Sequence, residues 1–342
     1  MRKIAIEEHF STEEHVDYLR SILEKKDTEQ EVNESEKALD LEVWWLSTSH
    51  YSLRGADIVA NGLLEMGEAR LREMDEAAID MQVLSLVSPG VQVSDASTAA
   101  IIARKVNDKL SGIIKEYPKR FAGLAALAPQ NPREAADELE RCVGELGLRG
   151  ACISSHTKGE YLDAEKYWVI LERAEKLDVP LYIHPRAPSP DMLKPYLTYP
   201  ALALAMYGFA VEAGLHAMRL ICSGLFDEYP RLKIILGHLG EALPFWLQRL
   251  DSRWLTAPLG KKLKKKPSEY FRDNFFVTTS GMFWQPPFLC TYLALGADRI
   301  LFAVDYPFES SKEAVRFIEE VPICDGDKEK ICHSNSEMLF RL

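Results

Sequence analysis

The chain has 342 residues, of which 47% are hydrophobic, and its formal net charge is −11 at pH 7. A chain of this length and apolar content can bury a large core. The acidic balance argues against non-specific binding to nucleic acid, but it does not exclude an anionic small-molecule substrate. We therefore expect no nucleic-acid partner.

Because the sequence begins directly with a strand-like segment, we expect no secretory leader. No stretch reaches the ~18 uncharged apolar residues of a membrane span, and the six cysteines lack CxxC spacing. In a chain this long, such cysteines are typical of reduced core thiols. These features predict a cytoplasmic protein without a membrane partner.

Eight short apolar runs follow one another along the chain, and amphipathic segments of helical period separate most of them. The runs are 3–10, 82–89, 121–129, 148–156, 179–185, 233–240, 275–281 and 299–307. Apolar strands alternating with helices are typical of a parallel sheet covered by helices. Eight of them predict an α/β fold, a (β/α)8 TIM barrel, with residues 1–342 as one domain. A doubly wound open sheet is the alternative, which the lack of a Gly-rich phosphate loop after the first run disfavours.

A long segment from about residue 25 to 64 separates the first two runs. It is polar with aromatic patches, as in VWWLSTSHYSLRG. Because it falls between the first strand and the second, we interpret it as an insertion over the barrel mouth.

Ionisable side chains gather where the apolar runs end. They are, in chain order, Glu7, Glu8, His9, His156, His184, His238 and Asp305. In a (β/α)8 barrel these ends lie on one face, where active sites are built. Each residue alone has an ordinary structural explanation, such as a satisfied core histidine or a turn-forming aspartate. Their concentration on one face predicts a functional site.

Carboxylate and imidazole ligands without thiolate suit Zn²⁺, Mn²⁺, Fe²⁺ or Mg²⁺. Glu7 and His9 are two residues apart in a strand, so they point to the same side, which we take to be inward, while Glu8 points outward. His184 and Asp305 complete a cup around the barrel axis that leaves room for a substrate. The predicted metal ligands are Glu7, His9, His184 and Asp305.

Several separated segments resemble the metal-dependent decarboxylases of the amidohydrolase superfamily. The E-x-H of Glu7 and His9 stands where most amidohydrolases have H-x-H. LYIHPR around His184, IILGHLGEALP around His238 and LFAVDYPFE around Asp305 are similar to signature segments of that branch. Its members decarboxylate γ-resorcylate, 2,3-dihydroxybenzoate, salicylate and 5-carboxyvanillate. SPGVQ (88–92) and SSHTKGEYLD (154–163) look most like the 5-carboxyvanillate enzyme, whereas a histidine at the place of His9 is kept in the γ-resorcylate type.

The resemblance implies a non-oxidative decarboxylase that binds a small aromatic carboxylic acid, an ortho-hydroxybenzoate, on one divalent ion (Mn²⁺, Zn²⁺ or Mg²⁺) without an organic cofactor. It implies that Asp305 protonates the ring carbon before CO₂ leaves, which requires Asp305 to be protonated beforehand. His238 and Glu241, three residues apart at the expected start of a helix, complete the predicted catalytic set. A homodimer or homotetramer is expected.

Four residues are candidates for contacts with the substrate. Phe10 directly follows the ligand-bearing strand, and His156 ends the fourth run. Arg54, in the aromatic insertion, is suited to pair with a second carboxylate or hydroxyl on the ring. Arg249 matches an arginine that relatives extend into the neighbouring subunit's site.

Two other functional classes remain open from the sequence. A hydrolase of a lactone or amide would use metal-bound hydroxide, but the chain lacks H-x-H and a plausible bridging lysine at the end of the fourth run. A barrel that has lost activity and serves as a binding or scaffold protein is the third possibility. The intact set of ligands at the strand ends disfavours it.

Overall fold

A computed structural model of the chain describes residues 1–26, 62–256, 259 and 261–342. The strands are β1 (Ile4–Phe10), β2 (Met81–Leu86), β3 (Phe121–Gly123), β4 (Ala125–Ala126), β5 (Ala151–Ser154), β6 (Leu181–His184), β7 (Ile234–Leu236), β8 (Phe275–Thr278) and β9 (Ile300–Leu301). The helices are α1 (Glu13–Lys26), α4 (Glu68–Glu76), α5 (Ala96–Glu116), α6 (Pro132–Gly144), α7 (Trp168–Leu177), α8 (Pro190–Leu193), α9 (Gly208–Cys222), α10 (Leu225–Glu228), α11 (His238–Glu241), α12 (Leu243–Thr256), α13 (Pro267–Asn274), α14 (Gln285–Leu295), α15 (Ser311–Glu320), α16 (Asp325–Glu329) and α17 (Asn335–Phe340).

All strand pairs are parallel and follow the order of the chain. One sheet has the order β1-β2-β3 and the other runs from β4 to β9. Backbone hydrogen bonds link the ends of the two sheets, from Leu124 to Leu84 and from Ile6 to Phe302. Because β3 and β4 are two parts of the single run predicted at 121–129, the eight predicted strands are neighbours in sequence order. This parallel α/β arrangement confirms the predicted fold class.

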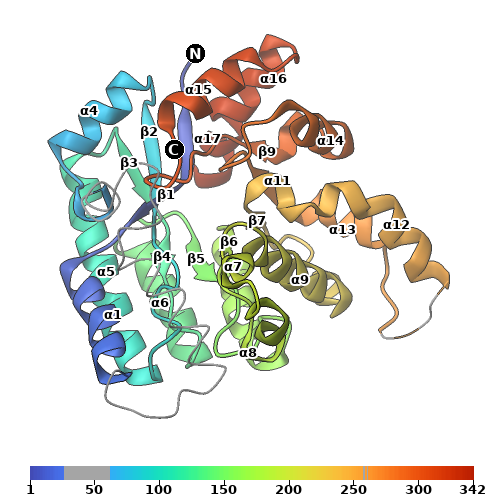
Figure 1. Ribbon diagram of the computed structural model, residues 1–342, viewed down its shortest axis with the longest axis horizontal. Coiled ribbons are helices and arrows are strands. Elements are labelled where there is room, and N and C mark those ends of the chain that lie inside the picture. The colour runs from blue at the N-terminus through green and yellow to red at the C-terminus, as the bar shows by residue number, and fades with distance from the viewer. Residues whose placement is uncertain (27–61, 257–258, 260) are drawn as a thin grey trace.

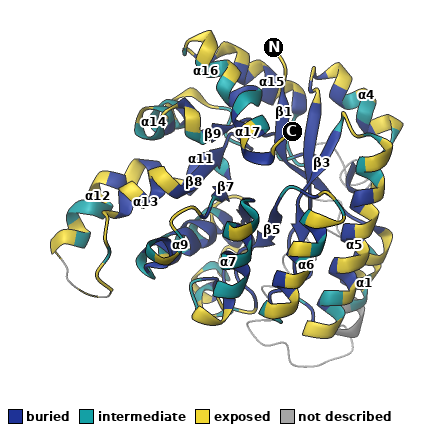
Figure 2. Ribbon diagram, turned by 180° about the vertical axis from the view of Figure 1, so that it is seen from behind, coloured by how far each residue is buried: buried dark blue, intermediate teal, exposed yellow. Residues whose placement is uncertain are grey.

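The helices surround the strands, as Figure 1 shows. In Figure 2 the strands are buried, and the helices turn exposed faces outward. One set of buried side chains, including Ile6, Tyr182 and Ile235, lies inside the ring of strands. Alternate positions on the same strands pack against the helices, which is the two-sided burial that a (β/α)8 fold requires.

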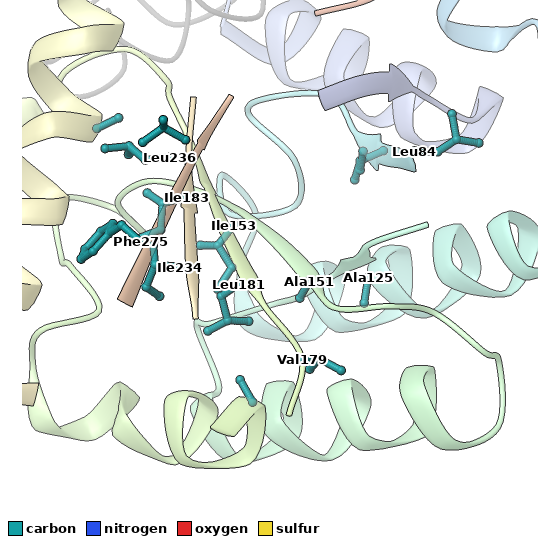
Figure 3. Close-up of a cluster of buried hydrophobic side chains, with 14 of the residues drawn as sticks. Leu84, Ala125, Ala151, Ile153, Val179, Leu181, Ile183, Ile234, Leu236 and Phe275 are labelled. Atoms are coloured by element: carbon teal, nitrogen blue, oxygen red, sulfur yellow. The ribbon is translucent and has the colours of Figure 1, made fainter. Parts of the chain in front are cut away.

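The core between strands and helices is built from branched aliphatic and aromatic side chains. Figure 3 shows part of it, with Ile153, Ile183 and Leu236 from adjacent strands beside Phe275. Each of these four side chains is fully buried. At ~25 cal/mol per Å² of apolar surface, such burial is the main stabilising contribution to the fold.

The insertion predicted at about 25–64 lies almost wholly within residues 27–61, outside the described residues. Its place over the barrel mouth therefore stays a prediction. The described chain enters α1 directly after β1 and resumes shortly before α4.

One described helical stretch, Pro200–Cys222, has the length and hydropathy of a membrane span. Half of its most apolar window is buried inside the fold. Two of its polar residues, Glu212 and His216, are fully buried, and both contact Ser155, which directly follows β5. We therefore interpret this stretch as a core helix that packs against the barrel.

Candidate metal centre and active site

The four predicted metal ligands meet at one point. Glu7 and His9 come from β1, His184 from the end of β6, and Asp305 from the segment that follows β9. One ligand atom of each residue lies within 4.8 Å of the others. His9 Nε2 is 3.0 Å from Asp305 Oδ1, and His184 Nε2 is 3.5 Å from Glu7 Oε1.

The direction of Glu7 does not follow from simple strand alternation. Ile4 and Ile6 belong to the core inside the barrel, so strict alternation would send Glu8 inward and Glu7 and His9 outward. In the structure Glu7 and His9 point inward and Glu8 points outward. The expected direction of Glu7 is therefore confirmed, but the alternation argument that led to it is wrong.

A β-bulge at Glu7 reverses the two faces of the strand. Ile6 pairs with Val83, but Glu8 pairs with Leu84, so the register shifts by one residue across Glu7. The φ angle of Glu7 is 72°, in the left-handed region. A bulge of this kind re-aims side chains beside it, which is a common use next to active sites.

Two hydroxyl groups hold one oxygen of Glu7 and leave the other for a ligand. Glu7 Oε2 accepts hydrogen bonds from Thr278 Oγ1 at 2.8 Å and from Ser280. Glu7 Oε1 is buried and has no hydrogen-bond partner among the described residues. Burial raises the pKa of Glu7 above its ordinary value. Thr278 and Ser280 are site residues that the sequence reasoning missed, although three hydroxyl residues end the run 275–281.

The imidazole of His184 is arranged as a metal ligand. Its Nδ1 donates to the Pro185 carbonyl at 2.8 Å, which places the lone pair on Nε2. That Nε2 is buried without a hydrogen-bond partner among the described residues, and burial holds the pKa of His184 well below its ordinary value. A neutral imidazole fixed by its other nitrogen is the usual form of a ligating histidine.

The donor set therefore fits a divalent cation. Two buried polar atoms, on Glu7 and His184, face a point that His9 and Asp305 also reach. A cation there would satisfy both atoms, whose burial without a partner is otherwise costly. Mixed carboxylate and imidazole donors suit Mn²⁺ and Zn²⁺.

His238 and Glu241 form a pair beside the four ligands, with Nδ1 and Oε1 2.8 Å apart. His238 Nε2 lies 3.5 Å from Asp305 Oδ2 and 3.8 Å from Glu7 Oε1. The sequence suggested that this segment is the start of an ordinary helix. The structure differs, because all residues from 238 to 242 have positive φ angles. The short element α11 is therefore a left-handed turn between β7 and α12 and not a right-handed helix.

The charges of this group act against one another. Burial lowers the pKa of His238, but the carboxylates of Glu241, Glu7 and Asp305 outweigh it and raise the pKa well above its ordinary value. Burial raises the pKa of Asp305, but His238 and His9 outweigh it and hold that pKa below its ordinary value. Without substrate, these neighbours favour the charged form of Asp305, and its protonation before the chemical step stays a prediction. The same carboxylates favour the protonated form of His238.

Phe10 is not a wall of the site. With Glu7 and His9 turned inward by the bulge, Phe10 faces the helices, where it is 1% exposed in the outer hydrophobic core. The prediction that it contacts the substrate is wrong, because a residue next to His9 in a strand points to the opposite side.

Both ring nitrogens of His156 are hydrogen-bonded to backbone groups. Its Nδ1 accepts from the Gly159 amide and its Nε2 donates to the Ala187 carbonyl, each at 3.1 Å. Burial holds the pKa of His156 well below its ordinary value, so the ring is neutral. With both nitrogens bound to backbone, His156 is a structural residue, and the prediction of a substrate contact is wrong.

The two candidate arginines have different outcomes. Arg54 lies outside the described residues. Arg249 lies on α12 with an exposed side chain. A substrate contact by either residue stays a prediction.

Comparison with known proteins places the chain in a family. Residues 44–342 match the amidohydrolase family. The chain belongs to this family.

Several relatives of this chain are decarboxylases. The chain is 38% identical to the gamma-resorcylate decarboxylase of Polaromonas sp. strain JS666, over 99% of this chain and 98% of the relative. It is similar to a crystal structure of 5-carboxyvanillate decarboxylase from Novosphingobium aromaticivorans with manganese and 4-hydroxy-3-methoxy-5-nitrobenzoic acid (TM-score 0.92, 36% identity, 100% and 96% of the two chains). It is also similar to a dihydroxybenzoic acid decarboxylase from Polaromonas sp. JS666 with manganese and the inhibitor 2-nitroresorcinol (TM-score 0.86, 38% identity, 100% and 97%).

Proposed function

We propose that this protein is a divalent-metal-dependent, non-oxidative decarboxylase of an ortho-hydroxybenzoate-type acid such as γ-resorcylate, 5-carboxyvanillate or 2,3-dihydroxybenzoate. The observation that carries the proposal is the convergence of Glu7, His9, His184 and Asp305, with ligand atoms within 4.8 Å of one another. The names of the full-length relatives support the same reaction class.

The reaction exchanges a carbon–carbon bond for a carbon–hydrogen bond. A proton adds to the ring carbon that bears the carboxylate, and the electron pair of the broken bond restores the aromatic ring as CO₂ leaves. A bound divalent cation would hold the carboxylate and phenol oxygens of the substrate and stabilise their charge. Asp305 is the group placed to deliver the proton, because it adjoins the ligand cluster and is 17% exposed where the other ligands are more deeply buried.

His238 supplies that proton. Its Nε2 is 3.5 Å from Asp305 Oδ2, and Glu241 holds its Nδ1 at 2.8 Å. An incoming carboxylate brings negative charge next to Asp305, which raises the affinity of Asp305 for a proton. We infer that the proton then moves from His238 to Asp305 and from there to the ring.

We further propose a homo-oligomer with α12 at the subunit interface. Phe245, Trp246 and Leu255 on this helix have exposed fractions of 73%, 45% and 68%, and α12 lies at the edge of the molecule (Figure 1). Large exposed apolar side chains of this kind mark interaction surfaces. A second copy seated there would bring Arg249 towards its neighbour's site.

The test is turnover on a panel of acids. Protein loaded with Mn²⁺ should convert at least one of γ-resorcylate, 5-carboxyvanillate and 2,3-dihydroxybenzoate to the ring product with equimolar CO₂. Removal of the ion with a chelator should abolish turnover, and Mn²⁺ should restore it. No turnover on the whole panel with Mn²⁺ bound would refute the proposal. Solvent ¹⁸O appearing in a product carboxylate would instead favour the hydrolase alternative.

A further inference from the structure

A buried polar cluster lies on the helix-facing side of β1, behind the metal ligands. It consists of Glu8, Arg70 from α4 and Gln82 from β2, each at most 1% exposed. Arg70 Nε donates to Gln82 Oε1 at 2.7 Å, and Gln82 Nε2 donates to Glu8 Oε2 at 3.0 Å. Burying a carboxylate and a guanidinium is costly even when they are paired. The cluster therefore calls for an explanation beyond filling space.

Both ends of this cluster hold the backbone that carries metal ligands. Glu8 Oε1 accepts the amide of Val304, the residue before Asp305, at 2.9 Å. Arg70 donates to the carbonyl of His9 at 2.8 Å. The Arg70 guanidinium also lies 4.4 Å from the centre of the Tyr306 ring, directly after Asp305. The cluster thus connects β1 to the segment after β9 on the side opposite the predicted ion.

The backbone at these two points needs such support. Glu7 and Asp305 have φ angles of 72° and 79°, in the left-handed region that is unfavourable for a residue with a Cβ atom. Strained conformations persist only where the surroundings over-determine them. Both residues are predicted metal ligands. Glu8 of the cluster directly follows Glu7, and its side chain binds the amide of Val304, which directly precedes Asp305.

We propose that Glu8, Gln82 and Arg70 are positioning residues for the metal centre, which hold the bulge at Glu7 and the turn at Asp305 in the geometry that binds the ion. This inference deepens the proposed function, because it rests on the metal site. None of the three residues is placed to contact the ion or the substrate.

The direction of the hydrogen bonds gives a specific test. Glu8 accepts on both oxygens, and Gln82 donates to Glu8 while accepting from Arg70. In Glu8→Gln, one donor faces another donor whichever way the two amides are turned. The double variant E8Q/Q82E removes this conflict, because the residue at 8 then donates to a carboxylate at 82 that still accepts from Arg70. The swap keeps atoms, volume and net charge nearly unchanged.

The measurement is the dissociation constant of Mn²⁺ for the full chain without substrate, read from the electron paramagnetic resonance of free Mn²⁺. We expect E8Q to weaken binding about 10- to 100-fold, the usual effect of removing a group that orients a ligand. E8Q/Q82E should recover most of the lost affinity. If E8Q does not fold, Gln82→Met, which removes both central bonds, should weaken Mn²⁺ binding in the same direction.

A matched control separates positioning from general stability. Glu138 on α6 is 12% exposed and binds Arg141 at 2.6 Å, so Glu138→Gln also removes a partly buried paired carboxylate. We expect this variant to lower the urea midpoint of the metal-free protein and to leave Mn²⁺ affinity unchanged.

Two outcomes would overturn the inference: E8Q binding Mn²⁺ as tightly as the wild type, or the double variant binding no better than E8Q. Neither measurement involves turnover, so the inference about the positioning residues can be refuted while the proposed decarboxylase function remains supported. Conversely, a wild type that binds Mn²⁺ but decarboxylates nothing would refute only the proposed function.

Discussion

At the scale of single residues, neighbouring carboxylates of the same type have different environments. The two oxygens of Glu7 have different roles: Oε2 accepts hydrogen bonds from hydroxyl groups, and Oε1 faces the predicted ion. Glu8 points outward from the barrel, as expected, but it does not reach water and is fully buried. The β-bulge at Glu7 thus gives adjacent glutamates different roles, with Glu7 as a predicted ligand and Glu8 as a supporting group.

Glu7→Gln should abolish metal-dependent activity. The amide removes the negative charge that faces the cation and replaces one strong acceptor with a weaker one. We expect Mn²⁺ affinity to fall by about two orders of magnitude or more, with loss of turnover even at excess Mn²⁺. Glu8→Gln should regain much of its activity when Mn²⁺ is raised to saturation. Equal behaviour of the two variants in a Mn²⁺ titration of turnover would contradict this assignment.

At the scale of elements, a short left-handed turn carries the proposed proton source. The turn contains Leu239 and Gly240, and Gly240 donates from its amide to the Gly237 carbonyl at 2.7 Å. Leu239 is 2% exposed, so burial of its side chain helps to offset the strain of its positive φ angle. The turn thereby sets His238 beside Asp305.

Gly240→Ala should damage this turn. A Cβ at residue 240, where φ is +81°, would lie 3.0 Å from Val277 Cγ1 and 3.1 Å from Pro244 Cδ. We expect a loss of about 1–3 kcal/mol in the free energy of unfolding, measured by urea denaturation. The turnover number should also fall because His238 is displaced, whereas Mn²⁺ affinity should change little.

A second glycine serves as the control for that substitution. Gly112 lies within α5, and a Cβ there would meet nothing within 4 Å. Gly112→Ala should stabilise the protein by up to about 1 kcal/mol with unchanged turnover. Gly240→Ala having no more effect than this control would refute the strained-turn interpretation.

At the scale of the whole molecule, the proposed interface predicts complementation between two inactive variants. A Glu7→Gln subunit lacks its own metal site but still offers Arg249, whereas an Arg249→Ala subunit has the reverse defect. If Arg249 acts in the neighbouring site, random mixing of equal amounts into dimers should restore about a quarter of wild-type activity. Subunits would be exchanged under mild denaturant and assayed afterwards. Activity no greater than the sum of the parents would place Arg249 outside the neighbouring site.

Acid should destabilise the molecule through its buried neutral histidines. Burial lowers the pKa of His15 to about 4 and that of His216 to about 3, against 6.5 in the unfolded chain. As the pH falls below 6.5, these histidines take up protons in the unfolded state but not in the folded state, until the pH reaches the folded-state pKa values. Their contribution to the free energy of unfolding is therefore complete above pH 6.5 and is lost as the pH decreases.

The size of this effect can be measured for His216. From pH 6.5 to pH 5, each such histidine should cost about 2 kcal/mol of unfolding free energy. His216→Gln should be less stable than the wild type at pH 7 but should lose correspondingly less on acidification. Identical pH slopes for the two proteins in urea denaturation would show that His216 does not titrate in this way.

The sequence alone predicted the fold class and the four residues whose side chains converge at the candidate metal site. Apolar runs that are buried on both faces alternate with amphipathic helices, and this pattern has few packed solutions. In that fold the strand ends share one face, so Glu7, His184 and Asp305 could be placed together from chain order. The fold class follows from periodicity, which local sequence carries, whereas the inward direction of Glu7 depends on the bulge.

Only the tertiary structure decided which neighbours of those ligands belong to the site. The bulge at Glu7 sends Phe10 to the outer core, and the loop backbone occupies both nitrogens of His156. The supporting roles of Arg70 and Gln82 depend on contacts between distant parts of the chain. A one-residue shift in strand pairing inverts every side chain beyond it, and that shift is set by non-local hydrogen bonds.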